Sequence, residues 1–481
     1  MLLWQLRAEV AQRDATIAQR DATIRLLEAE IEQRDQKLGA MAARIAELQA
    51  QLLRHFKVPP IKTSQDRLPH EQPRHHGKTK RKRGGQPGHP GHARALLPAD
   101  KVTERVTLIP DRCSDCGQVL SGTDPAPFIH QVVEVPPLCP KVTEYQCHRL
   151  VCPGCGKGTR APLPEGVALS AFGPRLCWLV AILSGKYHLS KRMVEEMLSD
   201  FLGVTLSLGS VSALEKTVTQ ALCKPACEAM AALKTSAVVH QDETGWRQEH
   251  KKAWLWVAVT ETVTVFVIDR HRSQKVSKEM IGQAYGGTVV SDRWSAYLWL
   301  PDEQRQLCWS HLLRDFEELV AVGGDGARLG KELYQQARRL FRYWHRVREK
   351  TLPFCALARK MKPVRREVKN LLVDGVRYFT GKAKSLSREL LGHEPALWRF
   401  VTTPGVEPTN NVAERALRQA VLWRRGSFGT QSEAGSTFVA RILTVIATLK
   451  QHGRNVLEYV TAACQAQLLG QQAPSLLPCP A

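Results

Sequence analysis

The sequence predicts an α/β domain with flanking helices, preceded by a separate N-terminal helix and a small cysteine-rich module. Three apolar, β-branched runs follow one another closely at 237–246, 253–262 and 262–270, and such spacing favours antiparallel strands joined by short turns. Another strand is indicated at 287–297, and 307–319 resembles a strand that turns into a helix. These observations place the main core in the second half of the chain.

Length and charge limit the class of protein. The 481 residues suggest about three domains. The formal charge of +22 favours a polyanionic partner, either nucleic acid or an anionic membrane. The most apolar stretch, Leu176 to Leu183, is too short to span a bilayer, and Arg7 and Glu9 stand where a secretory signal would be apolar. We therefore expect a basic cytoplasmic protein.

Residues 1–56 are predicted to form a coiled coil. One apolar column repeats every seven residues: Leu3, Val10, Ile17, Ile24, Ile31, Leu38, Ile45 and Leu52. A column sustained over so many heptads is typical of helices that associate, which predicts a homo-oligomer. The companion column includes Arg13, Arg20 and Arg34, which lower stability. The alternative is a single amphipathic helix packed on the protein's own core, but the stripe is narrow and favours self-association.

Residues 57–100 are predicted to be a linker arm rich in proline and glycine. Its basic residues form a dense run without an acidic residue: Arg74, Lys78, Lys80, Arg81, Lys82 and Arg83. The run is either a solvated tail or an arm that follows a phosphate backbone, and we favour the arm.

Residues 101–165 are predicted to hold structural zinc in a ribbon-like module that binds DNA. The thirteen cysteines include two CxxC pairs, Cys113 with Cys116 and Cys152 with Cys155. Four thiolates satisfy tetrahedral zinc and leave no position for a reactive water. Strands are predicted at 102–109 and 128–135. Cys139 and Cys147 are spare candidates outside any CxxC.

Residues 166–233 have a helical pattern. Within it, 189–203 and 207–218 read as two helices joined by a glycine turn, which fits a helix-turn-helix whose second helix enters a major groove. Two ordinary packed helices would give the same pattern, and the sequence leaves both interpretations open.

Three acidic residues are candidate metal ligands. Asp242 is placed at or near the end of the first strand, Asp292 at the end of a later strand, and Glu414 early in a helix. Carboxylates suit hard divalent cations that catalyse phosphodiester chemistry. By pattern alone Asp269 is as good a candidate, and Glu414 could form a capping box with Asn411.

A family resemblance bears on this choice. The chain resembles transposases of the insertion sequence 66 family through a series of ordered motifs, namely the zipper-like N-terminal helix, GGQPGH, the two CxxC pairs, DETGW, SDRWSAY, CWSHLLRDF, TNNVAERALR and WRRGSFGTQSEAG. The resemblance implies a DDE triad of Asp242, Asp292 and Glu414 on a ribonuclease-H-like mixed sheet with flanking helices. Residues 328–395 are rich in Leu, Arg, Lys and Glu without clear strand signals, which predicts a helical insertion, and the resemblance implies an insertion at this place. The catalytic domain is expected over 234–425, followed by a helical element over 426–481.

The resemblance further implies metal-dependent DNA cleavage and strand transfer with Mg²⁺ or Mn²⁺, in a nucleoid-associated protein that acts on element ends and target DNA and works with helper proteins. His311 and Arg314 are candidates for active-site support, with Cys308 and Trp309 in the same block. Further candidate phosphate contacts are Arg415, Arg424 and Arg425, and Glu414 could pair with Arg418 on one helix face.

Two rival functions are weighed against the transposase. A catalytically inactive, zinc-containing DNA-binding protein derived from a transposase would keep the basic arm and the cysteines but would not need the three acidic residues. A nuclease that only cleaves would use the same acidic site, so the sequence does not separate it from a transposase.

Overall fold

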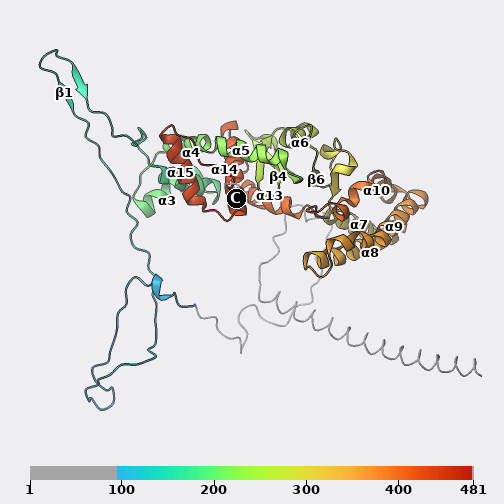
Figure 1. The fold of residues 1–481 in the computed structure, drawn as a ribbon, viewed down its shortest axis with the longest axis horizontal. Helices are drawn as coiled ribbons and strands as arrows, with labels where there is room; N and C mark the ends of the chain where they lie inside the picture. The colour runs from blue at the N-terminus through green and yellow to red at the C-terminus, as the bar shows by residue number, and fades with distance from the viewer. Residues whose placement is uncertain (1–94, 479–481) are drawn as a thin grey trace, which may run out of the picture. The chain divides into compact units, whose positions relative to one another are not determined.

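The computed structural model describes residues 95–478, and the chain divides into two units between Val132 and Val133 (Figure 1). The predicted coiled coil and nearly all of the predicted basic arm lie outside the described residues. Along the described part of the chain, no helix combines the length and apolar character needed to cross a membrane.

The cysteine-rich segment has little regular structure. In the described part of the first unit the only helix is the 3-10 turn η1 (Ala99–Lys101), and the strands predicted at 102–109 and 128–135 are not formed. That prediction is wrong because Val106, Leu108 and Val132 stay exposed with no strand beside them, and β-branched residues favour strands only where a partner takes up their side chains. The second unit begins with a hairpin of β1 (Arg149–Val151) and β2 (Gly158–Arg160).

A helical bundle precedes the sheet. It consists of α2 (Pro174–Gly185), α3 (Lys191–Leu202), α4 (Leu208–Ala221) and α5 (Cys223–Thr235). The Ser190 and Ser207 side chains accept backbone N–H groups at the starts of α3 and α4, and Gly203 ends α3 with a left-handed φ of 63°. The predicted helix, glycine turn and second helix are therefore confirmed as secondary structure.

The second helix of this pair is central to the bundle. Helix α4 packs against α2 and against two helices from the end of the chain, α14 (Glu433–Gln451) and α15 (Val456–Leu468). Its Val211, Leu214 and Val218 are buried. Helix α4 thus packs into the bundle through one face, while Ala213, Lys216 and Gln220 on its outer face stay exposed.

A five-stranded mixed sheet forms the middle of the second unit. Its strands are β3 (Val238–Gln248), β4 (Lys251–Val259), β5 (Thr264–Asp269), β6 (Thr288–Ser291) and β7 (Arg305–Leu307), in the order β5-β4-β3-β6-β7. The β3–β4 and β4–β5 pairs are antiparallel, which confirms the prediction of three antiparallel strands, whereas β6 and β7 run parallel to β3. Helix α6 (Gln274–Ile281) connects β5 to β6, and α13 (Asn411–Ser427) packs on β3 and β4.

A helical insertion with its own core separates β7 from α13, as predicted. After α7 (Trp309–Val322) come α8 (Asp325–Arg348), α9 (Phe354–Tyr378), α10 (Gly381–Gly392) and the short α11 (Glu394–Leu397) and α12 (Arg399–Thr402). Gly330 lets α8 approach α7 closely, since a Cβ there would meet the Phe316 carbonyl oxygen at 2.7 Å. Figure 1 shows α7–α10 at the opposite end of the sheet from α3, α4 and α15.

Helix α14 covers the free edge of β5 through two threonines one turn apart. The Thr444 hydroxyl accepts the Phe266 N–H at 2.9 Å, and the Thr448 hydroxyl accepts the Thr264 N–H at 3.1 Å. The Thr448 hydroxyl also lies 3.2 Å from the Thr264 carbonyl oxygen, to which it donates. The unpaired N–H and C=O groups of an exposed edge strand can pair with another chain. The bonds from α14 occupy these groups on β5.

We expect Thr448→Val to lower the free energy of unfolding by about 1 to 3 kcal/mol, because it leaves the buried Thr264 N–H without a partner. Thr437→Val is the matched control, since the Thr437 hydroxyl bonds only Glu433 of its own helix. Urea unfolding of both variants measures the difference. Equal losses would contradict the proposed role of α14 at this edge.

Candidate active site

The register of the sheet places two aspartates side by side. The parallel pairing of β3 with β6 ends where His240 faces Val290, so Asp242 and Asp292 both lie two residues beyond the last pair. Asp292 follows β6 directly, as predicted. Asp242 lies inside β3 and not at its end, because the antiparallel β4 continues the strand to Gln248 after the β6 pairing has stopped.

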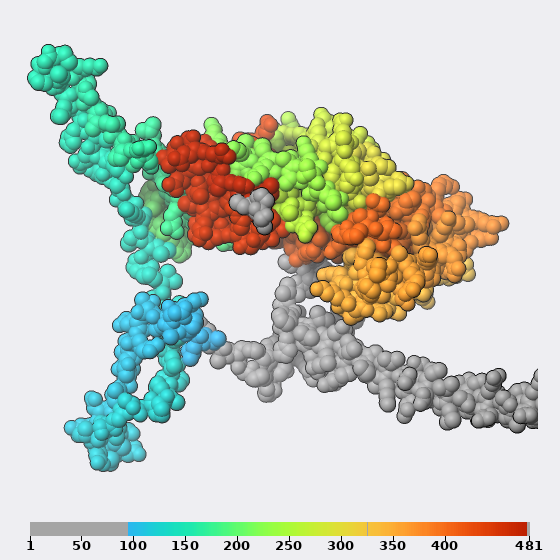
Figure 2. All heavy atoms as spheres, in the orientation of Figure 1, coloured from blue at the N-terminus to red at the C-terminus, as the bar shows by residue number. Residues whose placement is uncertain are grey.

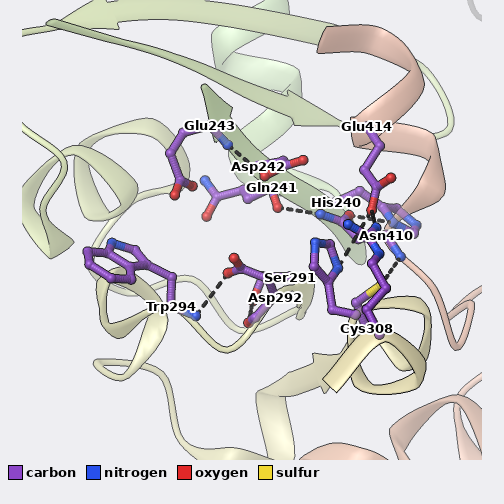
Figure 3. A network of polar contacts seen from close by, with 12 residues as sticks. His240, Gln241, Asp242, Glu243, Ser291, Asp292, Trp294, Cys308, Asn410 and Glu414 are labelled. Atoms are coloured by element: carbon purple, nitrogen blue, oxygen red, sulfur yellow. Dashed lines mark hydrogen bonds and ion pairs between the residues drawn. The ribbon is translucent and has the colours of Figure 1, made fainter. Parts of the chain in front are cut away.

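Glu414 joins the two aspartates from the first turn of α13 (Figure 3). Burial raises the pKa of Asp242 well above its usual range, and the negative charges of Glu243, Asp292 and Glu414 raise it further. Three elements distant in sequence thus bring mutually repelling carboxylates together. Asp269 lies elsewhere, at the end of β5, where its carboxylate accepts the His271 N–H at 2.7 Å.

Glu243 is a fourth carboxylate that the sequence analysis missed, although it is part of the DETGW motif. Its side chain is 1% exposed, accepts the Tyr297 hydroxyl at 2.5 Å, and pairs with Arg272 at 2.7 Å. The Arg272 guanidinium lies over two indole rings, 4.7 Å from the centroid of Trp254 and 4.0 Å from that of Trp294. Burial raises the pKa of Glu243, whereas Tyr297 and Arg272 lower it.

Glu414 contacts α7 and not its own helix. Its carboxylate lies 3.3 Å from the Arg314 guanidinium and 3.6 Å from His311 Nδ1, so the predicted pair with Arg418 does not form. Burial lowers the pKa of His311, and the Arg314 charge lowers it further. The structure therefore brings both residues of predicted active-site support to Glu414.

Cys308 and His311, together with Glu414 of α13, form a group of side chains that could bind a metal ion. Atoms of Cys308, His311 and Glu414 that could bind a metal ion all lie within 4.8 Å of one another. Burial raises the pKa of Cys308 to about 11, and its sulfur accepts the Asn410 N–H at 3.1 Å. Trp309, which follows Cys308 in the sequence, is fully buried.

Asn410 ties the start of α13 to β3. Its side-chain amide donates to the Gln241 carbonyl oxygen at 2.7 Å, and its Oδ1 lies 3.3 Å from His240 Nδ1. Asn410 is 1% exposed, and the Glu414 N–H donates to its carbonyl oxygen at 3.2 Å. No side-chain cap of the kind suggested by the Asn411 spacing is formed at this helix. The position of Glu414 thus depends on Asn410 (Figure 3).

The three arginines predicted on α13 have different environments. Arg415 and Arg425 are exposed. Arg424 is partly buried, and its guanidinium donates to the Gly245 carbonyl oxygen and to the Thr244 hydroxyl of β3. Arg424 therefore serves the packing of α13 on the sheet, which leaves Arg415 and Arg425 as candidates for phosphate contact.

The two CxxC turns share one backbone pattern. In the first turn the Cys113 N–H donates to the Gln118 carbonyl oxygen, and the Gly117 N–H donates to the Cys113 carbonyl oxygen. In the second turn the Cys152 N–H donates to the Lys157 carbonyl oxygen, and the Gly156 N–H donates to that of Cys152. Both glycines have a left-handed φ, 74° and 69°. The backbone N–H of Cys116 lowers the pKa of the Cys113 thiol, and that of Cys155 lowers the pKa of Cys152. Each turn by itself thus favours the thiolate that zinc requires. The boundary between the two units falls between the turns.

The mixed sheet with its flanking helices is compatible with a transposase domain. Residues 170–437 match the family model described as Transposase IS66 family, and this match covers more than half of the chain. The chain therefore belongs to the IS66 transposase family. It is also similar to the uncharacterised protein y4qI of Sinorhizobium fredii (strain NBRC 101917 / NGR234), with 27% identity over 234 residues, or 44% of this chain. The match spans 43% of the length of that relative.

We expect Asn410→Ala to lower the free energy of unfolding by about 2 kcal/mol, because the buried Gln241 carbonyl and the His240 ring lose their partner. The control is Asn411→Ala, which changes the same residue type one position along, at the partly buried first residue of α13. We expect a loss under ~0.5 kcal/mol for the control. Denaturant unfolding measures both, and equal losses would argue against the link between α13 and β3.

Proposed function

We propose that this protein is an active DNA transposase that cleaves the ends of its insertion sequence and joins them to target DNA. The observation that carries the proposal is the convergence of Asp242, Asp292 and Glu414 from β3, β6 and α13. An inactive DNA-binding relative would have no reason to hold repelling carboxylates together at a cost in stability. The partial match to the relative y4qI adds no information about substrate.

We further propose that the domain is of the ribonuclease-H-like type. Three antiparallel strands followed by two parallel ones, in the order β5-β4-β3-β6-β7, support this assignment. The helical insertion between β7 and α13 supports it as well, since it lies where the family resemblance places one.

The donor set fits a divalent cation of the Mg²⁺ or Mn²⁺ type. Carboxylate oxygens are the ligands that such hard ions prefer, and both burial and the neighbouring carboxylates raise the pKa of Asp242, an effect that a bound cation would oppose. Asp242, Asp292 and Glu414 would hold the ion, which would supply activation of the attacking oxygen and stabilisation of the leaving oxygen.

The protein's own groups contribute charge and position. In the nicking step, a water oxygen attacks the scissile phosphorus and the bond to the 3′ oxygen breaks, which leaves a 3′-hydroxyl on the element. In the joining step, that hydroxyl oxygen attacks a phosphorus of the target and displaces a second 3′ oxygen. Arg314 supplies a cation beside Glu414, where the phosphate would lie, and His311 is positioned to accept or donate a hydrogen bond. The protein forms no covalent bond to DNA in either step.

The remaining segments are proposed to recognise and pair the two ends. The CxxC turns would hold structural zinc, the basic run from Arg74 to Arg83 would follow phosphates, and the coiled coil over 1–56 would join two copies. Two ends must be cut in concert, which makes a homo-oligomer useful. Helper proteins of the same element are further proposed partners.

We expect Asp292→Asn to abolish nicking at the inverted-repeat ends, with a loss of at least about a hundredfold. The assay incubates the purified protein and Mg²⁺ with a plasmid that carries the DNA flanking this gene, and maps nicks and joined products. The control is Asp269→Asn, an aspartate that also ends an apolar strand but lies outside the carboxylate cluster. It should nick like the wild type.

The outcomes separate the rival functions. Equal nicking by wild type and Asp292→Asn would refute the triad. Nicks without joined products would favour a nuclease that only cleaves. Specific binding of the ends without nicking by any variant would favour the inactive DNA-binding relative.

We expect one zinc ion per chain, retained by Cys139→Ser and Cys147→Ser and lost in the double variant Cys113→Ser with Cys152→Ser. The physical reason is that four thiolates are needed for a closed tetrahedral site. Elemental analysis of the dialysed protein measures the metal content. A zinc-free wild type, or a double variant that keeps its zinc, would contradict the assignment.

A further inference from the structure

The insertion carries a disproportionate share of the charge of the chain. Residues 325–392, which form α8, α9 and α10, contain eighteen Lys and Arg but six Asp and Glu, a surplus of twelve out of the total +22. This segment makes the orange surface at one end of the second unit in Figure 2. Its excess of positive charge is larger than its own solubility requires, so it indicates an anionic partner.

Helix α8 gathers much of this charge on one face. Leu329, Leu333, Ala337 and Leu340 are buried on its inner face. The opposite face presents Arg338, Arg342 and Arg346 at successive turns, all exposed. Lys331 and Arg339 lie beside this row and are exposed as well. The arrangement follows from the helical repeat, because residues four apart lie one above the other.

The arginine row breaks a local rule of helix stability. Cations four residues apart repel each other, and acidic residues three or four positions away normally offset this. Neither Arg338 nor Arg342 has an acidic residue at those positions. Within the described residues, no ion pair involves Arg338, Arg342 or Arg346, whereas Arg328 at the start of the helix has Glu332 at 4.0 Å. Such uncompensated departures are expected where a ligand supplies the missing charge.

The arginine face is not the face through which α8 contacts α7, the helix that carries the partners of Glu414. The side of α7 that packs on α8 carries Phe316 and Leu319, against which Gly330 lies. The far side of α7 carries His311 and Arg314, the partners of Glu414. Gly330 is the point of close approach to α7, and the arginine row lies on a different face of α8 from Gly330.

We infer that the outer face of α8, centred on Arg338, Arg342 and Arg346, binds the phosphate backbone of a second segment of duplex DNA, distinct from the segment being cut. This inference rests on the proposed function, because a second DNA segment is needed only if the protein joins DNA ends to a target. The helix from Arg328 to Arg346 is about 27 Å long, which matches about eight base pairs of duplex. Guanidinium groups suit phosphate contact, and contact with the backbone alone gives no sequence preference.

The test measures how binding depends on salt. The full-length triple variant Arg338→Glu, Arg342→Glu, Arg346→Glu is titrated against a fluorescent duplex of unrelated sequence from ~50 to ~300 mM KCl. The matched control replaces three exposed lysines of the bundle, Lys216→Glu, Lys224→Glu and Lys234→Glu, with the same change in net charge. A third variant with lysine at the three arginine positions keeps the charge. Circular dichroism melting shows that each variant is folded.

If the face binds DNA, the slope of log K against log salt falls by about 2 to 3 in the α8 glutamate variant, close to the ~0.9 expected for each lost phosphate contact. The lysine variant keeps most of the slope, and the bundle control stays within about one of the wild type. Equal slopes for the α8 and bundle variants would overturn the inference and leave the row as a solvated face.

A second readout separates this inference from the proposed function. With wild-type protein active, the α8 glutamate variant should nick the element ends normally but join them to target DNA at least tenfold more slowly. Loss of nicking together with joining would place the row at the cutting site and overturn the claim of a second segment. If the wild type does not nick at all, the proposed function fails while the salt slope still tests the α8 face.

Discussion

Electrostatic repulsion within one cluster of carboxylates is the constraint around which the second unit is built. Burial raises the pKa of Asp242 and of Glu243, and the charges of neighbouring carboxylates raise both pKa values further. Such groups stay together only if the elements that carry them are fixed independently. The parallel pairing of β3 with β6 fixes the aspartates, and Asn410 fixes the start of α13. Arg272 and Arg314 then supply partial compensation from outside the cluster.

The insertion shows how a site can tolerate a long interruption in sequence. Helices α8–α10 form a second apolar core with α7. The chain leaves the sheet after β7 and returns beside it at Asn410, whose N–H donates to the Cys308 sulfur at the start of α7. The close approaches at Gly330 and Gly375 make this lobe compact.

The opposite side of the sheet is closed by the end of the chain. Threonines of α14 bond the free edge of β5, and α14 and α15 complete the bundle around α4. The helix-turn-helix pattern therefore lies within a supporting bundle.

The sequence by itself determined the elements whose signals are local. The three antiparallel strands, Asp292 at the end of β6, the helical insertion and the helix that carries Glu414 could all be predicted from periodicity and branching, and the resemblance to the family selected the triad from several possible aspartates. Only the tertiary structure decided the rest. Strand β3 continues past Asp242 because β4 pairs with it there, and 102–109 and 128–135 form no strands because no strand pairs with them. Arg424 bonds to the sheet, and Glu414 pairs with Arg314. Glu243 and Asn410 carry no local signal that distinguishes them, because their roles come from partners far away in sequence, such as Tyr297 and Gln241.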